Sequence, residues 1–286
     1  MSLVESAASD SVDRRWPTGL IGHEQSEFVA LGSPSSGGEQ NQRSLDLYIG
    51  GYRAHRGGPA GRPQGFLVHV EKNGIVKPHY HRVDQFQVFF GEDGASYKNT
   101  AMPTGTVGVH YVDAYSTYGP FTGGPDGLDY FTLRANGDGF VGYMPEAREH
   151  HIHRKGKRSL FAQVDAASAP ADGATTTNLF EHYDDGLACL LLRSSGDTEV
   201  VGPPLTGTSG QFYCVIRGDV ATEQGVFGAK SLAWVPANGD PLRLRSTSSA
   251  EFQVLVLQFP ALPSMPIPDP ILVGASAPAP AVNSGG

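Results

Sequence analysis

The chain of 286 residues has few cysteines, few cationic side chains and no long apolar runs. Its two cysteines, Cys189 and Cys214, lie in apolar contexts (GLACLLLR and QFYCVIRG), which indicates small buried side chains and not a disulfide framework. No stretch approaches the roughly 20 apolar residues of a membrane span, and the first residues lack the apolar core of a signal peptide. We therefore expect a cytoplasmic protein that is neither exported nor inserted in a membrane.

Positive charge is also scarce, since 21 Lys and Arg face 29 Asp and Glu, for a net charge of −8. Nucleic acids and anionic membranes favour a clustered positive surface, so this balance argues against both as partners. A small organic molecule is the expected partner. The sequence also has no Gly-x-Ser-x-Gly elbow, phosphate loop or dinucleotide fingerprint, which sets aside hydrolase-triad, kinase and Rossmann functions.

What the chain does contain is glycine and proline, 37 and 21 residues, with β-branched and aromatic runs between them. This composition is typical of many short strands joined by turns and predicts an all-β fold. Strand-like runs recur over residues 44–165 and again over 179–260. We expect an arm at 1–43, a linker of small and polar residues at 166–178, and a tail rich in proline and alanine at 261–286.

The two β-rich halves resemble each other. The run 85–91 (QFQVFFG) matches 212–218 (FYCVIRG) in pattern, and 109–113 matches 232–236. An internal duplication of one β-unit is therefore predicted, with a sandwich or small barrel as its architecture.

The segment 77–91, KPHYHRVDQFQVFFG, carries the chemistry that stands out most clearly. Side chains of a strand alternate between two faces, so His79, His81, Gln85 and Gln87 share one face. Two histidines at i and i+2 can present two nitrogens to one ion, and imidazole suits zinc, iron, copper and nickel. The open alternative is a polar pocket that holds an organic ligand through hydrogen bonds.

This segment resembles the first motif of the cupin superfamily through Gly74, His79, His81 and Gly91, with Gln85 where that family usually has glutamate. The second motif is matched only loosely by residues 112–119, where Tyr118 takes the place of the family's third histidine. The resemblance covers about residues 44–260. It implies two cupin-type β-barrel (double-stranded β-helix or jelly-roll) domains in one chain, the first of them metal-binding.

In the second copy, alignment on Gly218 places Phe212 at the glutamate position, Thr206 and Thr208 at the histidine positions and Pro241 at the last ligand. No imidazole or carboxylate remains there. We therefore interpret the second domain as a degenerate cupin with a structural role.

The family resemblance implies one divalent metal ion, held here by His79, His81 and Gln85. Iron(II) is favoured, and manganese, nickel, copper or zinc are alternatives. Tyr118 and His110 are the candidate catalytic residues, as acid and proton shuttle. Gln87, Arg134 and Tyr115 are candidates for substrate binding. Arg134 would pair with a carboxylate of the substrate.

An iron(II) oxygenase acting on a small organic molecule is the preferred function, because open metal positions would admit substrate and dioxygen. The alternatives are a non-redox isomerase or lyase of the same fold and a non-catalytic module that binds or senses a small ligand.

Three other histidines are not expected to bind a metal. The pair His151 and His153 lies in a basic segment without a β pattern, which predicts a solvated loop or, as the alternative, an anion-binding lid. His69, on an earlier strand, is expected in the wall of the domain and not as a ligand. A homodimer formed through strand edges is also expected.

Overall fold

Strands make up nearly all of the regular structure in the computed structural model, which describes residues 20–22, 27–31, 43–50, 62–168, 173–196, 198–247 and 251–267. Within these ranges the only helix is the short 3-10 turn η2 (Arg148–His150). The all-β prediction is thus confirmed. None of the described helical structure is long or apolar enough to cross a membrane.

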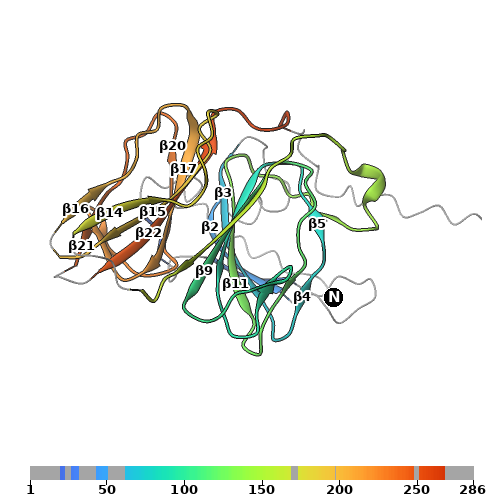
Figure 1. Ribbon diagram of the computed structural model, residues 1–286, viewed down its shortest axis with the longest axis horizontal. Coiled ribbons are helices and arrows are strands. Elements are labelled where there is room, and N and C mark those ends of the chain that lie inside the picture. Colours follow the sequence, from blue (N-terminus) through green and yellow to red (C-terminus); the bar gives the residue numbers. More distant parts are fainter. Residues whose placement is uncertain are drawn as a thin grey trace, which may run out of the picture.

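The first domain consists of two layers of antiparallel strands (Figure 1). Its large sheet has the order β1 (Glu27–Leu31), β2 (Arg43–Ile49), β3 (Gln64–Val70), β11 (Leu128–Arg134), β6 (Gln85–Phe90), β9 (Thr106–Val112) and β13 (Ser159–Asp165). The second layer holds the sheet β4 (Ile75–Val76), β10 (Phe121–Thr122), β7 (Ser96–Tyr97) and β8 (Thr100–Ala101), and the pair β12 (Gly142–Tyr143) and β5 (His79–Tyr80).

The second domain repeats this plan, as the internal similarity predicts. Its larger sheet has the order β14 (Ala174–Asn178), β15 (Ala188–Ser194), β22 (Phe252–Pro260), β17 (Thr208–Arg217) and β20 (Leu232–Pro236). The smaller sheet has the order β16 (Glu199–Val201), β21 (Arg243–Ser246), β18 (Val220–Thr222) and β19 (Gly225–Phe227). Over the described residues, the facing sheets of each domain do not join into a closed barrel.

Three features differ from the predicted boundaries. Residues 27–31, expected in the arm, form β1 and pair with β2 in the large sheet of the first domain. Residues 174–178, expected in the linker, form β14 and pair with β15, because three consecutive β-branched threonines suit an extended edge strand. Ile21, expected in a separate arm, forms an antiparallel bridge to Leu232 of the second domain. The rest of the predicted arm before residue 20, and the tail after 267, lie outside the described residues.

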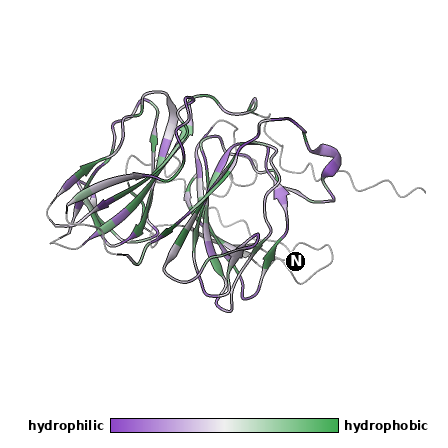
Figure 2. Ribbon diagram, viewed as in Figure 1, coloured by the Kyte–Doolittle hydropathy of each residue, from purple (hydrophilic) through white to green (hydrophobic). Residues whose placement is uncertain are grey.

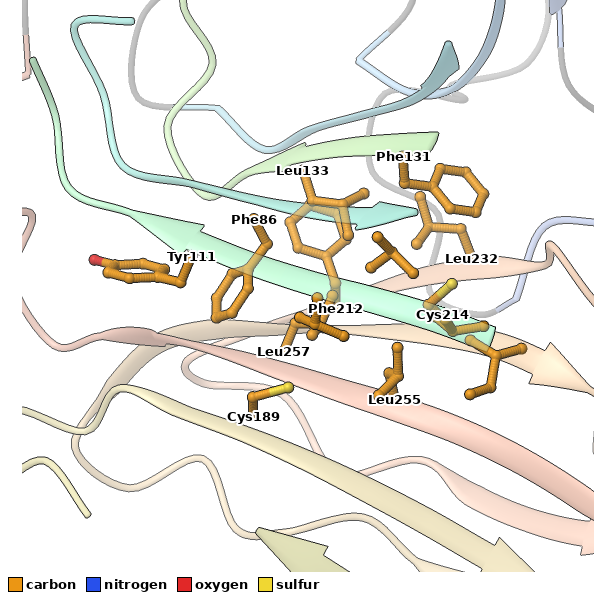
Figure 3. Packing of buried hydrophobic residues seen from close by; sticks show 14 of the residues in the cluster. Phe86, Tyr111, Phe131, Leu133, Cys189, Phe212, Cys214, Leu232, Leu255 and Leu257 are labelled. Atoms are coloured by element: carbon orange, nitrogen blue, oxygen red, sulfur yellow. The ribbon is translucent and has the colours of Figure 1, made fainter. Parts of the chain in front are cut away.

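The large sheets of the two domains pack back to back through one continuous apolar cluster (Figure 3). Strand alternation explains it, since Phe86 and Val88 of β6 point to the partner sheet while Gln85 and Gln87 point into the first domain. Both cysteines lie buried in this interface as free thiols, and burial raises the pKa of each. The interpretation of the cysteines as buried apolar side chains is therefore confirmed.

The interiors of the two domains differ in polarity. That of the second is mainly apolar, with Val215, Val254 and Leu244 among its side chains and Gln211 as a buried polar one. That of the first combines an aromatic cluster with buried polar side chains: Gln64, His79, Gln85, Gln87, His110, Thr132 and Arg134. Buried polar groups need partners, so a set of this size in one interior marks it as the candidate site.

Candidate functional site

His79 and His81 stand at the start of the site, on and just after β5. This strand is hydrophilic among its neighbours (Figure 2). His79 pairs through its backbone with Tyr118, and the two imidazole rings lie 5.3 Å apart, nearly perpendicular to each other. Pro78 precedes the strand, where the missing amide hydrogen costs no ladder bond.

Each of these histidines donates one ring proton to a backbone carbonyl. His79 Nδ1 lies 2.8 Å from the oxygen of Lys77, and His81 Nδ1 lies 2.5 Å from the oxygen of Phe140. Because a carbonyl only accepts, Nδ1 carries the proton in both rings and Nε2 carries the lone pair. Histidines that bind metals are typically held in this tautomer by such a bond.

Gln85, Tyr118 and Arg134 form a connected polar group next to the histidines. The amide nitrogen of Gln85 donates to the Tyr118 hydroxyl, and its amide oxygen accepts from Arg134 Nε at 3.0 Å. Burial raises the pKa of the Tyr118 phenol well above its usual value. Tyr118 is therefore protonated near neutral pH and can act as a hydrogen-bond donor, whereas binding a metal as phenolate is disfavoured.

Arg134 is a buried cation inside the first domain and not part of a surface ion pair. It donates to the side-chain oxygen of Gln64 at 2.7 Å and to the backbone oxygen of Asp138 at 2.6 Å. Its Nη2 lies 3.1 Å from His81 Nδ1 and 3.3 Å from His81 Nε2. Burial lowers the pKa of this guanidinium, but from so high a value that the charge remains.

His110 and Gln87 lie on neighbouring strands of the same interior. The ring of His110 donates from Nδ1 to the Gln87 oxygen at 2.7 Å, and its Nε2 faces the hydroxyls of Tyr97 and Ser159, both at 3.0 Å. Burial, followed by the nearby Lys98 and His79, lowers the pKa of His110 to about 3. The ring is therefore neutral, so His110 can orient its neighbours but cannot serve as a cationic acid.

Tyr115 is the predicted site residue that the structure does not bring into this group. Its ring stacks on Tyr80, whose side chain alternates with those of His79 and His81 and contacts Phe140 and His151 instead. Its backbone does reach the site, because Tyr115 N donates to the oxygen of His81 at 2.7 Å.

The residues present suit a divalent ion in part. His79 and His81 supply two lone pairs in the correct tautomer, and Gln85 supplies a neutral oxygen. The described residues contain no group of three or more His, Cys, Asp or Glu side chains placed to hold an ion. An ion here would therefore take further ligands from water or substrate. Metal binding at His81 Nε2 would also require the Arg134 guanidinium to move away from that atom. A carboxylate on the bound ligand could then accept hydrogen bonds from the guanidinium.

Sequence reasoning missed two members of the interior, Gln64 and Tyr97. Both are buried, Gln64 against Arg134 and Tyr97 against His110. The Nε2 atoms of Gln64 and Gln87 are buried without a hydrogen-bond partner. A signal existed for Gln64, because it has the same strand parity as the inward-facing Phe66 and Val68 of β3.

Outside this interior, His69 links the two domains. It lies on the other face of β3, where Nδ1 and Nε2 lie 2.7 Å and 2.9 Å from the carboxylates of Asp129 and Asp46. Lys230 of the second domain binds Asp129 at 2.7 Å. The prediction that His69 belongs to the wall of the domain agrees with this placement.

The basic segment after η2 has no strand and lies over the loop that follows β9. Arg154 and Arg158 bind Asp113, and Lys157 donates to the backbone oxygens of Tyr115 and Ile152. His151 and His153 lie with ring centroids 4.5 Å apart. The predicted loop is therefore present, and many of its charges are used within the chain.

The alignment of the second domain needs one correction. A bulge between Val215 and Arg217 adds a residue to β17, so counting back from Gly218 shifts the register by one. Phe212 consequently lies in the interface between domains, and Gln211 takes the interior position that corresponds to Gln85. The Gln211 side chain binds Tyr213 and Gln258.

Among the comparisons with known proteins, those of structure find relatives, and the two reported below with a TM-score of 0.50 or more agree with the fold. No known family profile matches the sequence, and no curated protein matches it. Among solved structures, a candidate dioxygenase from Nostoc punctiforme shares 11% identity at a TM-score of 0.59, over 90% of this chain and 86% of that one. A deletion mutant of Bacillus subtilis oxalate decarboxylase shares 8% identity at a TM-score of 0.50, over 84% and 77%. A cupin 2 conserved barrel domain protein from Leptotrichia buccalis shares 10% identity at a TM-score of 0.42, over 85% and 96%.

Proposed function

We propose, from the premise that this chain has the two-domain cupin fold, that its first domain is a metal-dependent enzyme acting on a small organic acid. The observation that carries the proposal is the pair of imidazoles, His79 and His81, whose Nδ1 protons are held by backbone carbonyls. Similar structures include a candidate dioxygenase and an oxalate decarboxylase, which suits this class of chemistry. Iron(II) and oxygenation are our preferred metal and reaction.

His79 and His81 would hold the ion, with Gln85 as a neutral third donor. A bound iron(II) would supply Lewis acidity and a route to dioxygen chemistry. The chain's own residues would do the rest of the work. Arg134 would bind a substrate carboxylate, which also balances the positive charge in an interior without a carboxylate ligand. Tyr118 would donate its proton in a hydrogen bond to the substrate, while neutral His110 fixes the amide of Gln87.

The test is a reaction screen on protein loaded with iron(II) or manganese(II). Oxygen uptake and mass spectrometry would follow a panel of aliphatic and aromatic carboxylic acids. We expect turnover of at least one acid, lost in His81→Ala and slowed in Tyr118→Phe. A matched control is His182→Ala, because that side chain is 87% exposed and pairs with Asp184 of the second domain. Equal turnover by metal-stripped and metal-loaded protein would overturn the proposal.

A second candidate function is a binding module without catalysis. It is favoured by the buried Nε2 atoms of Gln64 and Gln87, two donors that a ligand with acceptor oxygens would satisfy. Calorimetric titration of metal-free protein with benzoate and malonate separates the two functions. Tight binding without metal, together with no turnover in the screen, would favour the module.

A further inference from the structure

Asp84 lies in the middle of the loop that connects His81 to Gln85, and its carboxylate is buried. This carboxylate accepts two hydrogen bonds from a single residue that is distant in sequence. The backbone N–H of Ser264 lies 2.7 Å from Oδ2, and the Ser264 hydroxyl donates to Oδ1. Ser264 follows the last strand of the second domain and is separated from Asp84 by 180 positions in sequence. The C-terminal segment 261–267 is thereby fastened to the loop of the candidate metal site.

The same contact joins a second loop of the first domain. Ala114 N lies 2.8 Å from Asp84 Oδ1 and 3.1 Å from the Ser264 hydroxyl. The next residue, Tyr115, donates from its backbone to the oxygen of His81. The loop before Gln85 and the loop that carries Tyr118 are thus bonded directly to each other, and Ser264 bonds to both of them at that point.

The segment that contains Ser264 is itself anchored on the second domain. Ala261 N donates to the backbone oxygen of Asp185 at 2.9 Å, and the Asp185 carboxylate binds Arg158 at 2.7 Å. Arg158 in turn binds Asp113, which precedes Ala114. Figure 1 shows the chain after β22 leaving the second domain and running along the first. Two connections thus run from the second domain to the loops of the site.

We infer that Ser264 is a positioning residue, through which the second domain holds the His81–Gln85 loop in the geometry that the first domain uses. This assigns a role to a domain whose described interior is mainly apolar. The inference rests on the proposed function for its purpose, but the physical claim, that Ser264 fixes this loop, can be measured without activity.

The first experiment is hydrogen exchange by mass spectrometry on the full chain. Ser264→Ala removes the hydroxyl donor, and Asp84→Asn replaces the acceptor with an amide that cannot accept at both oxygens. We expect both variants to raise the exchange rate of peptides covering 81–86 and 113–118 by at least fivefold. Ser264→Thr, which retains a hydroxyl, restores protection. The matched control is Ser168→Ala, an exposed serine whose hydroxyl donates to the backbone oxygen of Asp165.

The second readout is cobalt(II), whose visible absorption reports the ligand set around it. In Ser264→Ala we expect the cobalt spectrum to change and the dissociation constant to rise at least fivefold, with the melting temperature unchanged and rescue by Ser264→Thr. Wild-type exchange rates in both Ser264→Ala and Asp84→Asn would overturn the inference. If the wild type binds no cobalt, the proposed metal function fails, while the exchange result still decides whether Ser264 positions the loop.

Discussion

The substitution Asp129→Asn tests how charge fastens the two domains together. Asp129 accepts hydrogen bonds from His69 of its own domain and from Lys230 of the second domain, both at 2.7 Å. An asparagine at this position would keep the shape of the side chain and lose its charge. The remaining charged neighbour of His69 is Asp46, at 2.9 Å.

The expected cost follows from the pKa of this carboxyl. Burial raises it, but the hydrogen bonds and charges of His69 and Lys230 outweigh burial and lower it from 3.8 to about 2. That difference corresponds to about 2 kcal/mol of stability at neutral pH. For a chain of this size such a loss lowers the melting temperature by roughly 4–8 °C.

The pH dependence has a defined sign. The contribution of Asp129 is present above its unfolded pKa of 3.8 and is lost as pH falls through about 2. Hydrogen bonding to Asp129 raises the pKa of His69 above 6.5, against the effect of burial. The contribution of His69 is therefore complete below 6.5 and is lost as pH rises through its folded-state pKa. The difference between wild type and Asp129→Asn should be largest near pH 5 and smaller near pH 9.

Thermal unfolding followed by circular dichroism at pH 3, 5, 7 and 9 measures this difference. Asp126→Asn is the matched control, because its carboxylate is 84% exposed and its nearest cation, Lys72, is 3.9 Å away. The control should change the melting temperature by less than about 2 °C. Equal melting temperatures for Asp129→Asn and wild type at pH 5, or a difference that grows toward pH 9, would refute the reasoning.

Three further predictions concern packing, the site and assembly. Phe86→Ala should lower the free energy of unfolding in urea by about 3–5 kcal/mol, since the ring is fully buried between Tyr111 and Phe259. A loss below about 1 kcal/mol would contradict the packing of Phe86 in the interface between the domains. Added malonate should tighten cobalt(II) binding at least tenfold in wild type and not in Arg134→Lys, because lysine cannot reproduce the bidentate contact with a carboxylate. Equal tightening in both proteins would exclude Arg134 as the residue that binds the carboxylate. Light scattering should give the mass of a homodimer, and a monomer at micromolar concentration would contradict that prediction.

Much of the site could be predicted from strand periodicity. Alternation along 79–87 correctly placed Gln85 and Gln87 on one interior face, because the pleat of β6 is regular. Alignment on Gly218 misplaced Phe212, since a bulge in β17 changes the register and a bulge leaves no clear mark in the sequence. Residues 174–178 looked like a linker by composition, although their threonines favour a strand.

Contacts between distant segments could not be predicted. Ser264 reaches Asp84 only because the two domains pack back to back, and the packing direction is set by many apolar contacts at once. Local patterns report which residues lie inside a domain. They do not report which loop of another domain lies over it. The interior role of Arg134 was within reach of alternation, but its bonds to Gln64 and Asp138 were not.

The most direct test of the account is the metal content of the first domain. Protein purified without added metal, and then dialysed against iron(II) or cobalt(II) without oxygen, would be analysed for bound metal. The account predicts one ion per chain in wild type and in His182→Ala, and none in the double variant His79→Ala, His81→Ala. An ion retained by the double variant, or none bound by the wild type with or without malonate, would contradict it.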